Sequence, residues 1–156
     1  MAFLSILSES LLYVSLSILM GSFLLFNIPD TDKPPLKVPK GVLLSAVASI
    51  PFLSIVPILE VAASLYGKQG FGQVLAAVLF TFDIGIAWIF TFFLSSLFFL
   101  FIWGAEVRTK RLHSVAGILL TISLIWIVSF TSHAKSIAEY EGFLAHTLHF
   151  LAMSVW

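Results

Sequence analysis

Four stretches of this sequence are long and apolar enough to cross a lipid bilayer: Phe3–Phe26, Gly41–Tyr66, Phe71–Trp103 and His113–Ser132. A helix needs about 20 consecutive apolar residues to span the hydrocarbon core. Sixty per cent of all residues are apolar and only 10% are charged, which is far from the composition of a soluble globular domain. Because lipid cannot satisfy backbone polar groups, these stretches predict an all-α fold, a polytopic transmembrane helical bundle.

A fifth apolar stretch, Gly142–Trp156, would be about 22 Å long as a helix, short of a hydrocarbon core of about 30 Å. We therefore expect about five helices, the last of them truncated. Residues 1–156 are expected to form a single transmembrane domain, the N-terminal part of a longer protein. Pro51 and Pro57 predict a kink in the second helix. The length of Phe71–Trp103 predicts a tilted helix or a projecting end.

The basic residues predict how the chain is oriented. Since Lys and Arg favour cytoplasmic loops, the more basic loops, at residues 28–40 and 104–112, are expected in the cytoplasm. The N-terminus would then lie outside, together with Glu9, Glu60 and the region from His133 to His149. The basic loops hold Lys33, Lys37, Lys40, Arg108, Lys110 and Arg111, and the opposite side holds Lys68 and Lys135.

Composition also excludes several function classes. The formal net charge is zero, so no basic field is available for nucleic acid. Cysteine is absent, which rules out disulfides, thiolate metal sites and thiol nucleophiles. The sequence offers no HExxH motif and no serine nucleophile with a plausible partner. We therefore do not expect an enzyme, and we assign no catalytic residue.

Three carboxylates lie within apolar stretches, where an ionisable group costs about 2.5–3.5 kcal/mol to insert. Counted at about 1.5 Å per residue, Glu9 and Glu60 each lie roughly 9 Å from the outer ends of their helices. Asp83 lies about 18 Å into the third helix, near the midplane. All three are candidates for cation capture or relay, although Asp83 could equally be a neutral carboxyl bonded to a neighbouring helix.

His146, His149 and Met153 are spaced i, i+3, i+7, which places two imidazoles and a thioether on one face of the last helix. Imidazole with thioether is a ligand set that favours copper, especially Cu(I). The same His pair could instead hydrogen-bond across the bundle, and Met commonly fills gaps between helices. His133 could be a third imidazole or a polar helix terminus, whereas His113 lies at the opposite, cytoplasmic interface.

The last 28 residues, SFTSHAKSIAEYEGFLAHTLHFLAMSVW, resemble the CopD family of copper-resistance and copper-uptake membrane proteins, including the membrane part of YcnJ-like proteins. The match consists of a small residue, His and Ala at residues 132–134, the run around His149 at residues 148–152, and the terminal Val155 and Trp156. The opening helix is similar to the family's first helix, with Glu9, Tyr13 and Gly21, but this match is less specific. The middle hundred residues agree only in hydropathy.

This resemblance implies copper binding and transport at a bacterial plasma (inner) membrane, with import as the direction, in copper homeostasis or resistance. It implies a periplasmic or extracellular CopC-like protein or domain as a partner. The family likeness gives His133, His146 and His149 as candidate copper ligands. The roles of Met153, Glu9 and Glu60 rest on depth along the helices. Family bundles contain more helices, so part of the copper site is expected beyond residue 156.

Two other functions remain open on sequence. A b-type cytochrome or membrane oxidoreductase subunit would use imidazoles as haem ligands. Such a site needs two His facing each other across helices; His133 and His146 might approach this, but His146 and His149 on one helix cannot bracket a haem, so we expect none. The third function is a structural subunit without a ligand, in which the His residues only pack.

Overall fold

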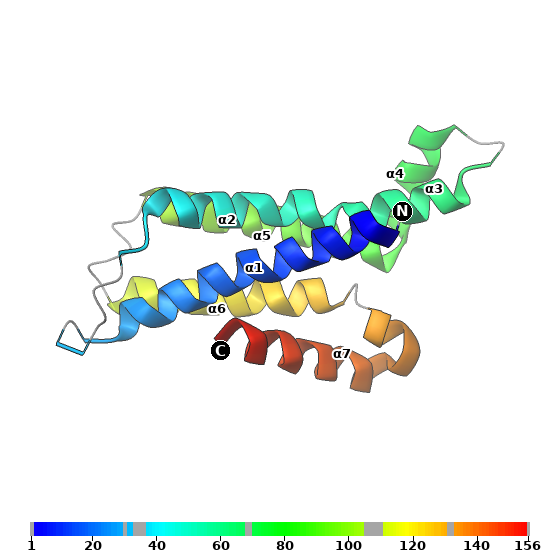
Figure 1. Cartoon of the computed structure of the whole chain (residues 1–156). Helices are drawn as coiled ribbons and strands as arrows, with labels where there is room; N and C mark the ends of the chain where they lie inside the picture. Colours follow the sequence, from blue (N-terminus) through cyan, green and yellow to red (C-terminus); the bar gives the residue numbers. More distant parts are fainter. Residues whose placement is uncertain are drawn as a thin grey trace.

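The computed structural model describes residues 2–29, 31–32, 37–67, 70–104, 111–130 and 133–155, with the backbone alone described at residues 2, 111 and 133–139. Within these ranges the chain is helical and contains no strand. The predicted all-α helical bundle is confirmed. The helices are α1 (Ala2–Asn27), α2 (Lys40–Ser54), α3 (Val56–Leu65), α4 (Phe71–Thr81), α5 (Asp83–Gly104), α6 (Arg111–Ser129) and α7 (His133–Val155) (Figure 1).

Four helical segments in the described part of the chain are long and apolar enough to cross a membrane: Phe3–Asn27, Lys40–Leu65, Asp83–Gly104 and Leu112–Ser129. The chain is therefore a membrane protein. The first, second and fourth predicted spans are confirmed, with ends that shift by a few residues. α4 is apolar but has only 11 residues, too few for a span of about 20.

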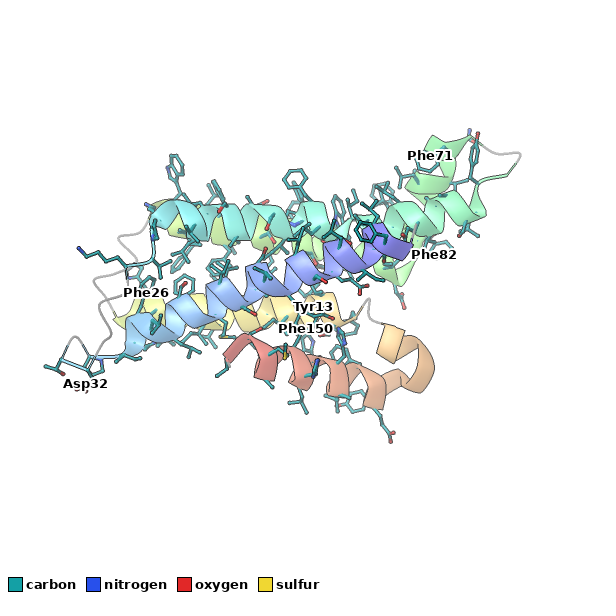
Figure 2. The ribbon with its side chains drawn as sticks, viewed as in Figure 1. Tyr13, Phe26, Asp32, Phe71, Phe82 and Phe150 are labelled. Carbon is teal, nitrogen blue, oxygen red and sulfur yellow. The ribbon has the colours of Figure 1, made fainter. Side chains whose placement is uncertain are left out.

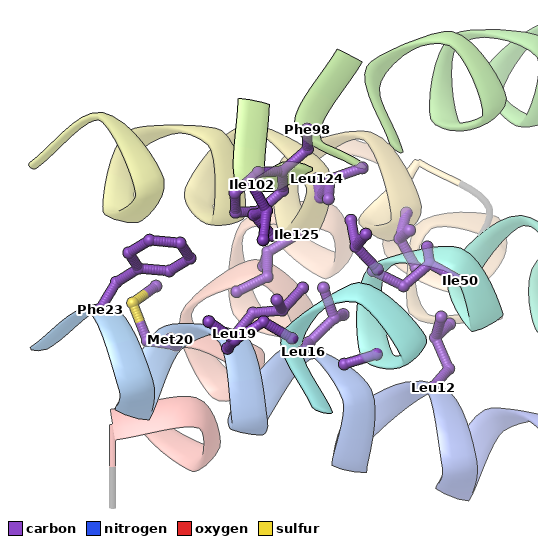
Figure 3. Packing of buried hydrophobic residues seen from close by; sticks show 14 of the residues in the cluster. Leu12, Leu16, Leu19, Met20, Phe23, Ile50, Phe98, Ile102, Leu124 and Ile125 are labelled. Carbon is purple, nitrogen blue, oxygen red and sulfur yellow. The ribbon is translucent and has the colours of Figure 1, made fainter. Parts of the chain in front are cut away.

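The four spans pack around one apolar core, in which α1 contacts α2 and α6, and α5 contacts α2 and α6. α7 lies along α1 and α6 (Figure 1). Lipid is as apolar as these side chains, so close packing rather than removal from water holds such helices together. Figure 3 shows side chains of this core, among them Leu16, Leu19, Phe23, Ile50, Phe98, Ile102, Leu124 and Ile125, all of which are fully buried.

The predicted kink in the second span is confirmed, because α2 ends at Ser54 and α3 begins at Val56. Pro51 lacks the N–H that would continue the helical ladder, and Pro57 enters the first turn of α3. The carbonyl of Pro51 accepts a hydrogen bond from the indole Nε1 of Trp88 in α5, at 2.9 Å. A neighbouring helix therefore covers a carbonyl at the break.

The third stretch is not one tilted helix, and the prediction of a continuous span over Phe71–Trp103 is wrong. It breaks at Phe82, whose backbone is extended, so that α4 folds back from α5. Gly85 permits this turn, because a Cβ there would overlap the backbone of α4 at Val78 and Leu79. As a result Asp83 lies at the first turn of α5, at one end of a span and exposed, and not near the midplane.

The last helix begins earlier than predicted. α7 starts at His133, so the loop expected before Gly142 is helical. The stretch before Gly142 is polar enough to suggest a loop, but it is rich in Ala, Lys and Glu, which have high helix propensity. The described chain thus has seven helices where about five were expected, and α7 is not among the four segments apolar enough to span.

Candidate cation site

A cavity of about 400 Å³ lies at the end of the bundle where α1 begins. Five helices and the end of α2 enclose it, and its lining mixes carboxylates, hydroxyls, aromatic rings and aliphatic side chains. The lining residues are Ser5, Ser8, Glu9, Leu12, Tyr13, Leu53, Ser54, Pro57, Glu60, Val61, Ser64, Ile84, Val128, His146 and Phe150.

Glu9, Glu60 and His146 line this one cavity although they come from α1, α3 and α7. The sequence counts Glu9 and Glu60 at similar distances from the ends of their helices, and both line this cavity together with His146. Helical spacing brings further groups with them. Ser5 and Tyr13 lie one turn to either side of Glu9, and Phe150 lies one turn after His146.

Aromatic rings join α7 to α1 at the cavity wall. The rings of Tyr13 and Phe150 lie 4.1 Å apart between centroids (Figure 2). The imidazole of His146 meets Phe150 edge to face, with centroids 4.9 Å apart. Phe150 is buried, whereas His146 and Tyr13 are half-buried. The imidazole is therefore oriented by packing against an aromatic ring that the bundle core fixes in place.

Most serine hydroxyls of the lining already donate a hydrogen bond to a backbone carbonyl. Ser8 Oγ donates to the carbonyl of Ser5 and Ser64 Oγ to that of Val61, each at 2.8 Å, and Ser54 Oγ donates to Pro51 at 3.4 Å. Their oxygens keep lone pairs that can accept a hydrogen bond. Glu60 Oε1 is buried and has no hydrogen-bond partner in the described part of the chain.

His149 and Met153 do not share the cavity with His146. α7 buries Phe143, Thr147, Phe150 and Ser154 against the bundle, whereas His149 is exposed and Met153 is 56% exposed. The two imidazoles and the thioether predicted as one ligand set are therefore not brought together in the cavity. All three positions lie to the same side of the stripe of α7 that is buried against the bundle, and His146 is the nearest of them to that stripe.

The remaining predicted residues lie elsewhere. Asp83 is not part of the cavity lining. His133 begins α7, but its side chain lies outside the described residues, so its role as a ligand stays a prediction. His113 lies at the opposite end of the bundle, where its ring stacks on Phe101 with centroids 5.9 Å apart. This position agrees with the sequence argument that His113 cannot join a site near the other ends of the helices.

The described residues contain no group of three or more His, Asp or Glu side chains already placed to hold a metal ion. Glu9, Glu60 and His146 therefore share a cavity without converging on one point. A metal bound by all three would require movement of at least one side chain or helix.

Sequence reasoning missed most of the cavity wall. Phe150 was noted only within the family match, and the lining serines were not considered. A spacing of four residues could have found Ser5 from Glu9, Ser64 from Glu60 and Phe150 from His146, but it gives no signal for Ser8 or Ser54.

Comparison with known proteins leaves the chain without an assigned family. No family model matches it, and no curated protein or solved structure does either. The likeness to the CopD family thus rests on the quoted residues alone, and copper handling stays a prediction.

Proposed function

We propose that this chain binds copper and transports it across the plasma (inner) membrane of a bacterium, with import as the direction. The observation that carries the proposal is the cavity within the bundle, which is lined by two carboxyl groups and an imidazole from three helices. Ionisable groups are costly inside a membrane and mark ion pathways when they face a cavity. A structural subunit that binds no ligand would not need three ionisable groups in the lining of one cavity.

The donor set of the cavity suits copper as cargo. One imidazole nitrogen and two carboxylate groups form a nitrogen and oxygen set, which favours Cu(II) over Cu(I). The thioether of Met153 would favour Cu(I), but it lies outside the cavity lining. We therefore propose His146 as the nitrogen ligand, with Glu9 and Glu60 as the groups that attract the cation and bind it.

Capture of the ion requires the three groups to approach one another, and the fold offers a place for this movement. α3 carries Glu60 and is joined to α2 through the single turn residue Ile55. α3 and α4 pack on each other through a small cluster formed by Ile58, Ala62, Val74 and Val78, and Ile84 and Trp88 of α5 pack against it. We therefore propose that Glu60 approaches His146 by movement of its side chain within the cavity, and not by movement of the hairpin.

The proposed orientation of the chain in the membrane is based on the basic residues at one end of the bundle. At that end Lys40 Nζ donates to the carbonyl of Trp103 at 2.7 Å, and Asn27 Nδ2 donates to Ser114 Oγ at 2.8 Å. With the basic loops in the cytoplasm, the cavity opens toward the exterior or periplasm. A CopC-like protein would deliver copper on that side.

Whole-cell copper content tests the proposal. The double variant Glu9→Gln/Glu60→Gln removes both charges from the cavity and keeps its shape, so accumulation above the level of empty cells should be lost. Glu141→Gln is the matched control, because Glu141 is an exposed carboxylate on α7 outside the cavity. Equal copper content in the wild type and the double variant, at equal amounts of protein in the membrane, would rule out the proposal.

A further inference from the structure

We infer that the same cavity binds the primary ammonium group of a small organic amine. The inference shares the cavity with the proposed function but does not depend on copper. It rests on three independent properties of the lining: its size, its hydrogen-bonding pattern and its aromatic wall.

The cavity is larger than a metal ion needs. Its volume of about 400 Å³ lies in the range of sites for small organic ligands, roughly 300–1,000 Å³. Its lining carries the carboxyl groups of Glu9 and Glu60 and contains no Lys or Arg. A ligand of matching charge is therefore a monovalent or divalent cation that also fills space.

Most polar groups of the lining can accept a hydrogen bond, and three of its four serine hydroxyls already donate one within the protein. Ser8, Ser54 and Ser64 already donate to backbone carbonyls, so what they offer a ligand is lone pairs. Glu60 Oε1 is buried without a partner among the described residues, and the carboxylate of Glu9 adds further acceptors. A primary ammonium group has three N–H donors and no acceptor, which complements this pattern.

The aromatic and aliphatic parts of the wall fit the rest of such a molecule. Tyr13 and Phe150 form a ring pair beside the carboxylates, and ring faces attract ammonium groups within about 6 Å. Leu12, Val61 and Val128 line the same cavity and can contact a short alkyl chain. A free alkylamine and the headgroup of phosphatidylethanolamine both carry such an ammonium group, and the experiment below distinguishes these two sources.

Isothermal titration calorimetry of the full chain in phosphatidylcholine nanodiscs tests the inference, with butylammonium chloride as the probe. We expect saturable binding, and no binding of 1-butanol, which has the same alkyl chain without the charge. Glu9→Gln/Glu60→Gln should weaken butylammonium binding by about tenfold or more, because charge-assisted hydrogen bonds are lost. Glu141→Gln should bind as the wild type does.

A second variant covers the case in which the double Gln variant fails to fold. Ser64 is exposed at the edge of the cavity, so Ser64→Leu fills space without disturbing the core, and it should also weaken binding. Nanodiscs containing phosphatidylethanolamine separate the two sources. If phosphatidylethanolamine weakens the binding of butylammonium, the site binds the lipid headgroup. If phosphatidylethanolamine has no effect, the site binds a free amine.

The inference fails if butylammonium gives no saturable heat in the wild type in phosphatidylcholine, or binds Ser64→Leu and the double Gln variant as tightly as the wild type. Copper titrated into the same samples distinguishes this failure from failure of the proposed function. Binding of copper without butylammonium overturns only the ammonium site, and binding of butylammonium without copper overturns only the copper proposal.

Discussion

The indole Nε1 of Trp88 donates a hydrogen bond to the backbone carbonyl of Pro51 across 2.9 Å, and so joins α5 to the kink between α2 and α3. The hydroxyl of Ser54 donates to the same carbonyl over a longer distance, 3.4 Å. The same indole packs against the small cluster between α3 and α4. Trp88 thus fixes the segment that carries Glu60 relative to the rest of the bundle.

We expect Trp88→Phe to lower the stability of the protein by about 1–3 kcal/mol, because a partly buried carbonyl loses the hydrogen bond from the indole. The midpoint of thermal unfolding in detergent measures the effect. Trp103→Phe is the matched control, since the Trp103 side chain is 65% exposed and Phe keeps both a ring that can stack on Phe99 and the backbone carbonyl that accepts from Lys40. Equal losses in the two variants would contradict the role given to Trp88.

Gly117 sets the distance between α1 and α6. A Cβ at this position would overlap the ring of Phe23, which is fully buried and stacks on Phe98. Gly117→Ala should therefore destabilise the bundle by about 1–3 kcal/mol through overpacking. Gly21→Ala should be neutral or stabilising, because no atom would lie within 4 Å of its new Cβ and Ala favours the helix.

The combination of Gly117→Ala with Phe23→Leu provides a further check. A smaller side chain at position 23 removes the overlap, so the double variant should be more stable than the sum of the two single losses. If the loss of stability in the double variant equals the sum of the two single losses, Gly117 and Phe23 do not interact as proposed.

Gly85 has an analogous role at the turn between α4 and α5. The atoms that a Cβ would meet there belong to backbone, at Val78 and Leu79, and cannot move aside as a side chain can. We expect Gly85→Ala to separate α4 from α5 and to expose position 78 to labelling. Because the chain has no cysteine, Val78→Cys introduces a single thiol that reports this directly. The variant Val78→Cys should react slowly with a maleimide, and Val78→Cys combined with Gly85→Ala should react faster. Equal rates would contradict the close approach.

The sequence was sufficient to predict the helical membrane bundle and a few residues of the cavity. Hydropathy alone predicts three of the four spans, because length and apolar content are what a bilayer requires. The presence of Glu9 and Glu60 in one cavity agrees with counting residues from the ends of helices that share a membrane. Pro51 and Pro57 predict the kink because a missing N–H is a local property.

The other features depend on contacts that hydropathy does not encode. The break at Phe82 lies inside a long, mostly apolar stretch without proline, and it depends on the approach of Gly85 to the backbone of α4. The choice of His146 over His149 depends on which stripe of α7 meets α1 and α6. The spacing predicts both residues on one face of the helix. Which of them lines the cavity depends on how α7 packs against its neighbouring helices.

The copper content of the purified protein tests the assignment of the site most directly, measured for the wild type beside the single variants His146→Ala and His149→Ala. We expect His146→Ala to lose bound copper, because its imidazole lines the cavity, and His149→Ala to retain it, because that residue is exposed. Retention of copper by His146→Ala, or its loss from His149→Ala alone, would contradict a copper site in this cavity.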